Sequence, residues 1–427
     1  MGQKHNITDL HQMQSLPLKA KISMTNLRIQ QWVEEYGEDG VYVSFSGGKD
    51  SMVLLDLVRK LYPSIVAVFV DTGLEYPEIR EFVKRFENVE WLKPKKTFRR
   101  VITEYGYPFI SKEVSDKVYG ARRYLKELKE YNARGGGGNV RYAWAIADLT
   151  GIDRRIDPNN PAYQKLLHPN LDAPTENSRY QQIIGTYPGK DGKPSSYNFT
   201  KYQFFLDAPF EISASCCRIM KKSPVHSYAR KTGRKPMTAQ MASESRLRTS
   251  QWLKNGCNGF NMKSPISNPM SFWTEQDVLL YIRIRQDEYD SNLRDCNLEV
   301  KCSADKRRRK MARNYIKKHK RFEICSVYGD IVGSNGEKES LPKNVADMGV
   351  LDLDRPLLKT TGCDRTGCMF CGYGCHLEKP GNGRFERMKL THPKQYDYIM
   401  RPREQGGLGY KEIIDWINEH GNFDIRY

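Results

Sequence analysis

The chain lacks any long apolar run. Nowhere do about 18 apolar residues follow one another, which is the length that a membrane-spanning helix needs, so a transmembrane protein is excluded. Residues Met1 to Leu16 are polar and lack the apolar segment of a secretory signal. No internal repeat is present either. These absences predict a soluble, cytoplasmic protein that has no membrane partner.

The composition is that of a folded protein. Hydrophobic residues make up 39% and aromatic residues 11% of the 427 positions, which supplies a core and excludes wholesale disorder. The length suits two or three domains, or one α/β domain with insertions.

Positive charge is concentrated in one short segment. The net charge is +18, and the stretch from Lys301 to Arg321 holds eleven Lys and Arg against one acid, Asp305, a local net of +10. Such a segment is typical of contact with the backbone of DNA or RNA. The alternative is a solvated, lysine-rich helix that aids solubility.

The ten cysteines are placed unlike a disulfide framework. A chain of this length without a secretory signal is expected to keep its thiols reduced. Cys216 and Cys217 are adjacent, and four more cysteines fall between residues 363 and 375. Clustered thiols indicate metal ligands or redox groups, and thiolates suit iron–sulfur clusters and zinc alike. The remaining alternative is a set of packed, reduced cysteines.

Strand and helix patterns alternate from residue 41 to residue 92. Residues 41–45 are a short β-rich run, and residues 64–70 are continuously apolar, as in a parallel strand buried on both faces. Residues 51–62 have helical spacing between them. Residues 77–86 predict a second helix with Pro in its first turn, and residues 89–92 a third strand. This order predicts a doubly wound α/β fold with a mostly parallel sheet.

The rest of the chain divides less clearly. Helices are expected at residues 18–35, 111–131, 274–285 and, in the basic segment, 301–321, and a further strand at 235–243. Gly135 to Gly138 predicts a flexible break, whereas the stretch from Asp153 to Lys201 yields no prediction. The expected domains are a helical lead-in (1–36), the α/β domain (37–290) with an insert at about 132–205, a basic insertion (291–322) and a cysteine-rich region (323–427).

The strongest local signal is Ser44-Phe-Ser-Gly-Gly-Lys-Asp-Ser51, between a predicted strand and a predicted helix. Two consecutive glycines let the backbone approach an anion without Cβ obstruction. The following helix offers unpaired N–H groups and the positive end of its dipole. Hydroxyl groups and a positive charge come from Ser46, Ser51 and Lys49. The pattern predicts a phosphate-binding bend, with an unliganded turn as the alternative, and it lacks the four-residue gap of a Walker loop.

This bend resembles the PP-loop of ATP pyrophosphatases, S-G-G-x-D-S, which split ATP between the α and β phosphates. A second match follows the next strand, where Val70-Asp-Thr-Gly73 with Glu75, Pro77 and Glu78 resembles the phosphoadenylyl-sulfate (PAPS) reductase branch. The resemblance implies an adenine nucleotide alpha hydrolase-like fold and bound ATP and Mg²⁺. It implies nucleotide contacts by Ser44, Ser46, Gly47, Gly48, Lys49, Asp50, Ser51, Asp71, Thr72 and Gly73, with Lys49 and Asp50 also catalytic.

The cysteines carry a second resemblance. Cys216-Cys217-x₃-Lys221-x₂-Pro224 and Gly367-Cys368-x₂-Cys371 resemble the assimilatory adenylyl-sulfate (APS) reductases, in which four thiolates hold a [4Fe–4S] cluster. The implied ligands are Cys216, Cys217, Cys368 and Cys371, with Cys363 as a further candidate and Zn²⁺ as the alternative metal. Residues 241–248 resemble the arginine-bearing loop of that family. Lys221, Arg246 and Arg248 are thereby implied to meet the substrate anion.

Two departures from the reductases shape the functional expectation. The S-G-G-K-D-S bend is intact, and no cysteine follows Cys375, so the nucleophilic tail of a reductase is missing. The chain therefore resembles sulfur-transfer enzymes, such as those that thiolate tRNA or act in DNA phosphorothioation, in which ATP adenylates a substrate and a sulfur donor displaces AMP. One alternative is a PAPS or APS reductase that uses Cys375, next to His376, with a thioredoxin-like partner. Another is a nucleic-acid-binding partner that only senses ATP.

Overall fold

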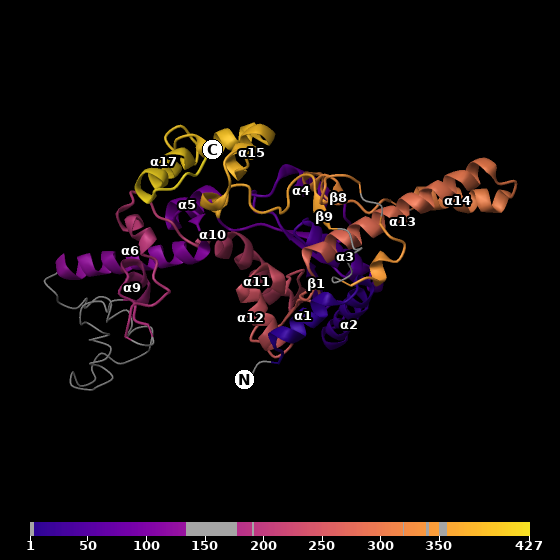
Figure 1. The fold of residues 1–427 in the computed structure, drawn as a ribbon, viewed down its shortest axis with the longest axis horizontal. Coiled ribbons are helices and arrows are strands. Elements are labelled where there is room, and N and C mark those ends of the chain that lie inside the picture. Colours follow the sequence, from indigo (N-terminus) through magenta and orange to yellow (C-terminus); the bar gives the residue numbers. More distant parts are fainter. Residues whose placement is uncertain (1–3, 134–176, 190–191, 319, 339–340, 350–356) are drawn as a thin grey trace. The chain divides into compact units, whose positions relative to one another are not determined.

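The computed structural model describes residues 4–133, 177–189, 192–318, 320–338, 341–349 and 357–427 (Figure 1). The chain divides into two compact units, of which the first is Met1–Lys95 with Met220–Met369 and the second Lys96–Ile219 with Phe370–Tyr427. The expected break at 135–138 and most of the stretch 153–201 lie outside the described residues.

A six-stranded sheet forms the centre of the first unit, in the order β3-β2-β1-β5-β7-β6. All neighbouring strands are parallel except β6 and β7, which are antiparallel. The mixed α/β fold with a mostly parallel sheet, predicted from the alternating pattern, is confirmed. The strands are β1 (Val41–Ser44), β2 (Ala67–Val70), β3 (Val89–Leu92), β5 (Lys235–Met237), β6 (Asn258–Gly259) and β7 (Ile266–Ser267).

The strand order reverses at β1. This strand pairs with β2 on one side, with Val43 opposite Ala67, and with β5 on the other, with Val43 opposite Met237. The chain then builds the sheet outward in both directions from β1. In open sheets of this kind, ligands bind at the carboxyl ends of the strands on either side of such a reversal.

Helices flank this sheet in sequence order. The first half of the unit has α1 (Ile7–Ser15), α2 (Leu18–Tyr36), α3 (Lys49–Leu61) and α4 (Pro77–Val83). The second half has α11 (Ser223–Thr232), α12 (Arg246–Asn255), α13 (Glu275–Cys302) and α14 (Lys306–Lys318), followed by the short β8 (Ile331–Gly333) and β9 (Leu358–Thr360). None of the helices in the described parts of the chain is long and apolar enough to cross a lipid bilayer.

The basic segment is two helical pieces rather than the single helix predicted over 301–321. Lys301 lies in the last turn of α13, which ends where Ser303 adopts an extended conformation. The carboxylate of Asp305 then accepts a hydrogen bond from the backbone N–H of Arg307 at 2.7 Å, at the start of α14. The one acid of the segment therefore marks the beginning of a new helix, as expected of Asp at such a position.

The core of the first unit is formed by the sheet and the apolar face of α3. Val53, Leu54 and Val58 on that face are fully or almost fully buried, as are Val43 and Phe69 of the sheet. Burial of such side chains contributes about 1.5–3 kcal/mol each. The packing fixes the first turn of α3, and with it the predicted bend, against the end of β1.

The second unit is mainly helical. It contains α5 (Phe98–Tyr105), α6 (Lys112–Ala133), α9 (Ser178–Ile184), α10 (Ser215–Cys217), α15 (Arg384–Thr391), α16 (Pro393–Met400) and α17 (Tyr410–Gly421). Its short strands β4 (Phe109–Ile110) and β10 (Gly372–Tyr373) are parallel. Aromatic rings of Tyr107, Phe109 and Tyr410 pack against one another with centroids 5.1–6.4 Å apart. This cluster joins the two parts of the chain that form the unit.

A buried ion pair ties α2 to α13. The ammonium group of Lys21 lies 2.7 Å from Asp277 Oδ2, and both side chains are fully buried. Lys21 also donates to the carbonyl of Gln14 at 2.6 Å, while Asp277 accepts from the backbone N–H of Thr274 at 2.7 Å. The pair thus satisfies two buried charges that neither helix satisfies alone.

We expect Lys21→Met to lower the free energy of unfolding by about 3–5 kcal/mol, because the carboxylate of Asp277 would stay buried without its counter-charge. Urea denaturation followed by circular dichroism measures the loss. Lys19→Met is the matched control, since Lys19 is 71% exposed in its pair with Asp347, and it should change stability by less than about 1 kcal/mol. Equal effects of the two substitutions would contradict this role of the buried pair.

Candidate nucleotide-binding site

The predicted bend lies between β1 and α3, at the point where the strand order reverses. Gly47 has a φ of +73°, a conformation that side chains other than glycine rarely adopt. A Cβ at this position would also stand 2.8 Å from Val83 and 2.9 Å from Ile79 of α4. Glycine is therefore required at residue 47 by both backbone conformation and packing.

Hydrogen bonds inside the bend hold its two serines together. The hydroxyls of Ser46 and Ser51 are 3.0 Å apart. Ser46 Oγ accepts from the N–H of Gly48 at 3.3 Å, and Ser51 Oγ donates to the carbonyl of Gly48 at 2.9 Å. The bend is thus preformed, with its hydroxyls on the side from which α3 begins.

A distant part of the chain covers the bend. The backbone N–H of Lys49, the first residue of α3, donates to the hydroxyl of Tyr328 at 3.2 Å. That hydroxyl lies 2.6 Å from Thr366 Oγ1. The ammonium group of Lys49 donates to the carbonyl of Asp364 at 2.7 Å and pairs with Glu275 at 3.0 Å. Lys49, expected to reach a phosphate, is therefore engaged with protein groups.

The covering group is a neutral hydroxyl. Burial raises the pKa of Tyr328 to about 12, so the side chain keeps its proton at neutral pH. Tyr328 ends the short 3₁₀ turn Ser326–Tyr328, and its carbonyl accepts from the N–H of Gly362 at 2.9 Å. The turn and residues 362–366 thus form one cap over the start of α3.

A cavity of about 150 Å³ opens beside the bend at the carboxyl ends of β1 and β2. Three of the predicted site residues line it, and residues of the cap line it as well. These residues are Ser44, Ser46 and Lys221, with Thr366 and Gly367 from the cap. The structure therefore brings Lys221 to the bend, as the resemblance implied.

The second predicted loop, Asp71 to Gly73, reaches this cavity through its neighbours Val70 and Glu75. The carboxylate of Asp71 pairs with Arg80 at 2.9 Å, and the N–H of Thr72 donates to Glu75 at 3.0 Å. The loop is therefore ordered by its own side chains at the edge of the cavity.

Charged side chains meet next to the bend. Burial raises the pKa of Asp50, and the charge of Lys49 opposes this effect. Burial lowers the pKa of Arg248, and the charge of Arg365 lowers it further. Both arginines pair with Glu244, Arg365 at 3.2 Å. Of the two predicted arginines, Arg248 thus lies among the charges around Asp50, whereas Arg246 is exposed at the start of α12.

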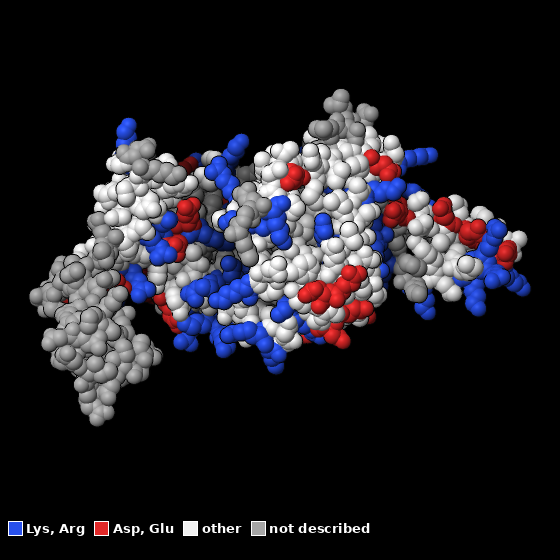
Figure 2. All heavy atoms as spheres, turned by 90° about the horizontal axis from the view of Figure 1, so that it is seen from below, with Lys and Arg blue, Asp and Glu red and all other residues white. Residues whose placement is uncertain are grey.

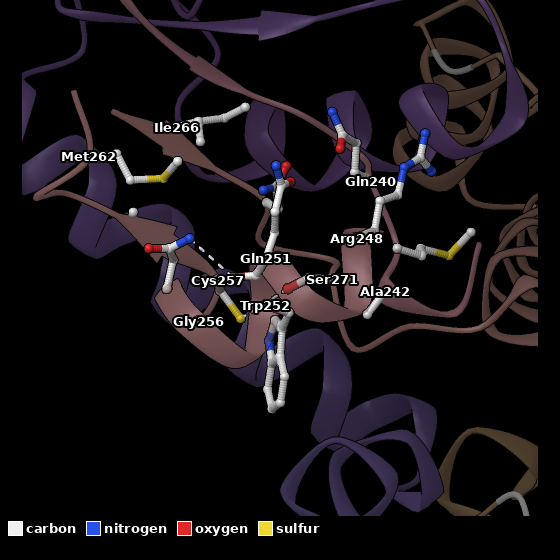
Figure 3. A pocket seen from close by; sticks show the side chains of 14 residues that line it. Gln240, Ala242, Arg248, Gln251, Trp252, Gly256, Cys257, Met262, Ile266 and Ser271 are labelled. Carbon is white, nitrogen blue, oxygen red and sulfur yellow. Dashed lines mark hydrogen bonds between the residues drawn. The ribbon is translucent and has the colours of Figure 1, made fainter. Parts of the chain in front are cut away.

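Arg248 also lines a second cavity, drawn in Figure 3, with Gln240, Trp252 and Cys257. Its volume is about 20 Å³, which is room for little more than one water molecule. The hydroxyl of Ser271 donates to Cys257 Sγ at 3.3 Å. This space is a packing gap between α12 and the sheet rather than a site for a nucleotide.

Four cysteines lie in one region of the second unit. Cys216 and Cys217 belong to α10, Cys371 precedes β10, and Cys375 begins a 3₁₀ turn. Charges on Cys217, Cys371 and Cys216 all act on Tyr373, whose pKa is raised chiefly by burial. Burial likewise raises the pKa of Cys371, and that of Cys375 to about 12. These thiols therefore face a common, buried environment.

The other two predicted ligands, Cys363 and Cys368, belong to the first unit. The N–H of Cys363 donates to the carbonyl of Val327 at 2.8 Å, so this residue is part of the cap. Within the described ranges, no three Cys, His, Asp or Glu side chains are arranged to hold a metal ion. The expected cysteine-rich metal-binding region is not shown.

Sequence reasoning missed the residues that close the bend. Tyr328, Thr366 and Glu275 belong to no motif of the nucleotide loop, and Lys49 and Tyr328 are 279 residues apart. In the second unit it also missed Arg384, which donates to the carbonyl of Cys371 at 2.7 Å. A lone Tyr or Arg carries no local signal, so only the fold reveals these contacts.

Comparison with known proteins places this geometry among sulfur-metabolism domains. Residues 40–137 match the phosphoadenosine phosphosulfate reductase domain. The uncharacterized protein MJ0973 of Methanocaldococcus jannaschii is 46% identical over 96 residues, which is 21% of this chain and 22% of that protein. Adenosine 5'-phosphosulfate reductase 2 of Bacillus subtilis is 32% identical over 87 residues, 19% and 36% of the two chains. That reductase of Staphylococcus haemolyticus is 26% identical over 136 residues, 30% and 51%. The chain thus spans about half or less of these relatives.

Proposed function

Since residues 40–137 form a domain of the phosphoadenosine phosphosulfate reductase family, we propose that the first unit binds ATP and cleaves it between the α and β phosphates, adenylating a substrate for sulfur transfer. One observation carries the proposal. The intact bend of Ser46 to Ser51 stands at the reversal of the strand order and adjoins a cavity lined by Ser44 and Lys221. Nucleotides bind at this place in doubly wound sheets.

The reaction follows from the groups at the bend. A substrate oxygen attacks the α phosphorus, the bond from that phosphorus to the bridging oxygen breaks, and pyrophosphate leaves with the electron pair. The N–H groups at the start of α3 and the ammonium group of Lys49 would hold the pyrophosphate as its charge develops. A sulfur donor, such as a persulfide or a thioredoxin-like partner, then attacks the adenylated carbon or phosphorus centre of the substrate, and AMP departs.

Asp50 is the residue that fits a Mg²⁺ ion. Among the described residues its Oδ1 is buried and has no hydrogen-bond partner, and carboxylate oxygen is a preferred magnesium ligand. The ion supplies neutralisation of phosphate charge when bound. Removing the burial cost of an unpaired carboxylate would favour binding of the cation at this point.

The cap has to yield for the phosphates to enter. The hydroxyl of Tyr328 accepts the hydrogen bond from Lys49 N–H that a phosphate oxygen would otherwise accept. Lys49 must likewise exchange the carbonyl of Asp364 for phosphate. Each lost bond is replaced by a charge-assisted one, which is roughly twice as strong, so the exchange favours the nucleotide.

We also propose a [4Fe–4S] cluster on Cys216, Cys217, Cys368 and Cys371. The burial and shared environment of the first two with Cys371 support this donor set, and the two-residue spacing of Cys368 and Cys371 is common in thiolate sites. Zinc is the alternative for the same thiolates. The cluster would supply or relay electrons or sulfur to the reaction.

A reductase that releases sulfite from PAPS or APS is the second candidate. The names of the Bacillus and Staphylococcus relatives favour it. Its nucleophile here would be Cys375, which is only 3% exposed, and a buried thiol is a poor nucleophile. The ATP-cleaving function is therefore preferred. A protein that binds ATP without turnover would be the third candidate.

Lys49→Met tests the proposed reaction. With α-labelled and γ-labelled ATP, Mg²⁺ and anaerobic protein, the unaltered chain should yield AMP and pyrophosphate. The substitution should lower the rate by about 10²–10³, the effect of removing one group that stabilises developing charge. Lys60→Met, at the far end of α3 and 44% exposed, is the matched control and should retain the rate.

Orthophosphate and ADP as products would contradict α–β cleavage. Should Lys49→Met fail to fold, Ser46→Ala provides the same comparison at a partly exposed residue. Sulfite released from PAPS or APS and lost in Cys375→Ser would instead establish the reductase.

Iron and acid-labile sulfide analysis tests the cluster. We expect about four irons per chain in anaerobic protein, lost in Cys368→Ser and retained in Cys302→Ser, since Cys302 is exposed on α13. Iron retained in Cys368→Ser but lost in Cys375→Ser would overturn the proposed ligand set. Zinc in place of iron would overturn the cluster itself.

A further inference from the structure

Helices α13 and α14 form a hairpin that extends away from the sheet of the first unit (Figure 1). On α14 the apolar side is turned toward its partner, since Ala312 is buried and Ile316 is half-buried. Figure 2 shows Lys and Arg side chains gathered toward the end of this projection, with Asp and Glu on it as well. The position of those acids decides whether the positive charge is available to a partner.

Four cations of α14 lie on one face of the helix. Lys306, Lys310, Arg313 and Lys317 follow one another at steps of four, three and four residues, which places them in a single row. All four are exposed. At the rise of an α-helix the row is about 16 Å long, enough to meet several successive phosphates of a nucleic-acid strand.

This row of four cations is not neutralised by the acids of α13. Three of those acids are engaged by arginines outside the row at 2.9–3.1 Å, namely Asp287 by Arg283, Glu288 by Arg285 and Asp290 by Arg321. Within the described part of α14, the cation that lies within 4.0 Å of acids is Arg308, which is outside the row. The four side chains therefore offer their full charge.

A cavity of about 1000 Å³ lies at the root of the same hairpin. Tyr289 and Asn292 of α13 and Tyr315 of α14 stand in its wall, and Lys317 and Lys320 border it. Lys317 thus belongs to both the row and the cavity. Aromatic rings stack on nucleobases, and an amide side chain both donates to and accepts from their edges.

The acids in the wall of this cavity are already paired. They are Asp56 and Glu288, each within 3.4 Å of Arg285, and Glu323, 3.3 Å from Arg85. The wall therefore presents aromatic and amide groups, with unpaired lysines at its edge, rather than net negative charge. A base with its attached phosphate matches this combination.

We propose that the α13–α14 hairpin binds single-stranded nucleic acid, with phosphates along Lys306, Lys310, Arg313 and Lys317 and unstacked bases in the cavity beside Tyr289 and Tyr315. A strand with free bases is specified because the bases of a duplex are stacked and cannot enter a cavity. The inference deepens the proposed function by naming the class of substrate, and binding itself does not require ATP cleavage.

The test is fluorescence anisotropy of labelled 20-nucleotide oligo(dT) and oligo(rU), and of a duplex of the same length, at several salt concentrations without ATP. We expect the single strands to bind more tightly than the duplex. The variant K306Q/K310Q/R313Q/K317Q should bind at least about tenfold more weakly at low salt. Its slope of log affinity against log salt should flatten by about 2–3, as expected for four lost phosphate contacts.

The matched control is K231Q/K254Q/K263Q/K343Q, which removes the same charge from exposed lysines of the first unit and should retain most of the affinity and slope. Tyr289→Leu, which keeps apolar volume but removes the ring, should weaken single-strand binding about fivefold or more. Equal losses in both quadruple variants, tighter binding of the duplex, or no effect of Tyr289→Leu would overturn the proposal.

The two proposals fail separately. Pyrophosphate release without nucleic acid should be unchanged in K306Q/K310Q/R313Q/K317Q, while Lys49→Met should bind the oligonucleotides as the unaltered chain does. Preference for oligo(rU) over oligo(dT), or the reverse, distinguishes an RNA from a DNA substrate.

Discussion

The left-handed bend at Gly47 is the constraint on which the rest of the site depends. Its φ of +73° and its contact with Ile79 and Val83 leave no room for a side chain, and it turns the end of β1 directly into the first turn of α3. That turn offers its N–H groups at the reversal of the strand order, where the sheet opens to a ligand. The cavity, the charged groups and the cap are all arranged around this point.

The cap gives the site a closed state made by the protein itself. Tyr328 and Asp364 use the hydrogen-bonding groups of Lys49, while Arg365 and Arg248 share Glu244. A buried N–H or ammonium group without a partner is costly, so these contacts satisfy the bend when phosphate is absent. A triphosphate would replace them with stronger bonds. The cap also connects the bend to Cys363, and through residues 366–371 the chain runs on to the proposed cluster ligands.

Sequence patterns predicted the parts of this arrangement that are local. The alternation of strands and helices from residue 41 to residue 92, and the position of the bend between β1 and α3, follow from period and glycine spacing. Lys221 beside Ser44 was implied by resemblance. The cap was not predicted, because Tyr328 and Lys49 meet only through the fold. The break of the basic segment at Asp305 was missed because one capping residue is a weak signal within eleven cations.

A crystal structure with a nonhydrolysable ATP analogue, bridged by methylene between the α and β phosphates, tests the central claim most directly. The account predicts a phosphate oxygen within hydrogen-bonding distance of Lys49 N–H, the adenosine toward the cavity of Ser44 and Lys221, and the hydroxyl of Tyr328 displaced. Density for the analogue elsewhere, with Tyr328 still bound to Lys49 N–H at saturating concentration, would contradict it.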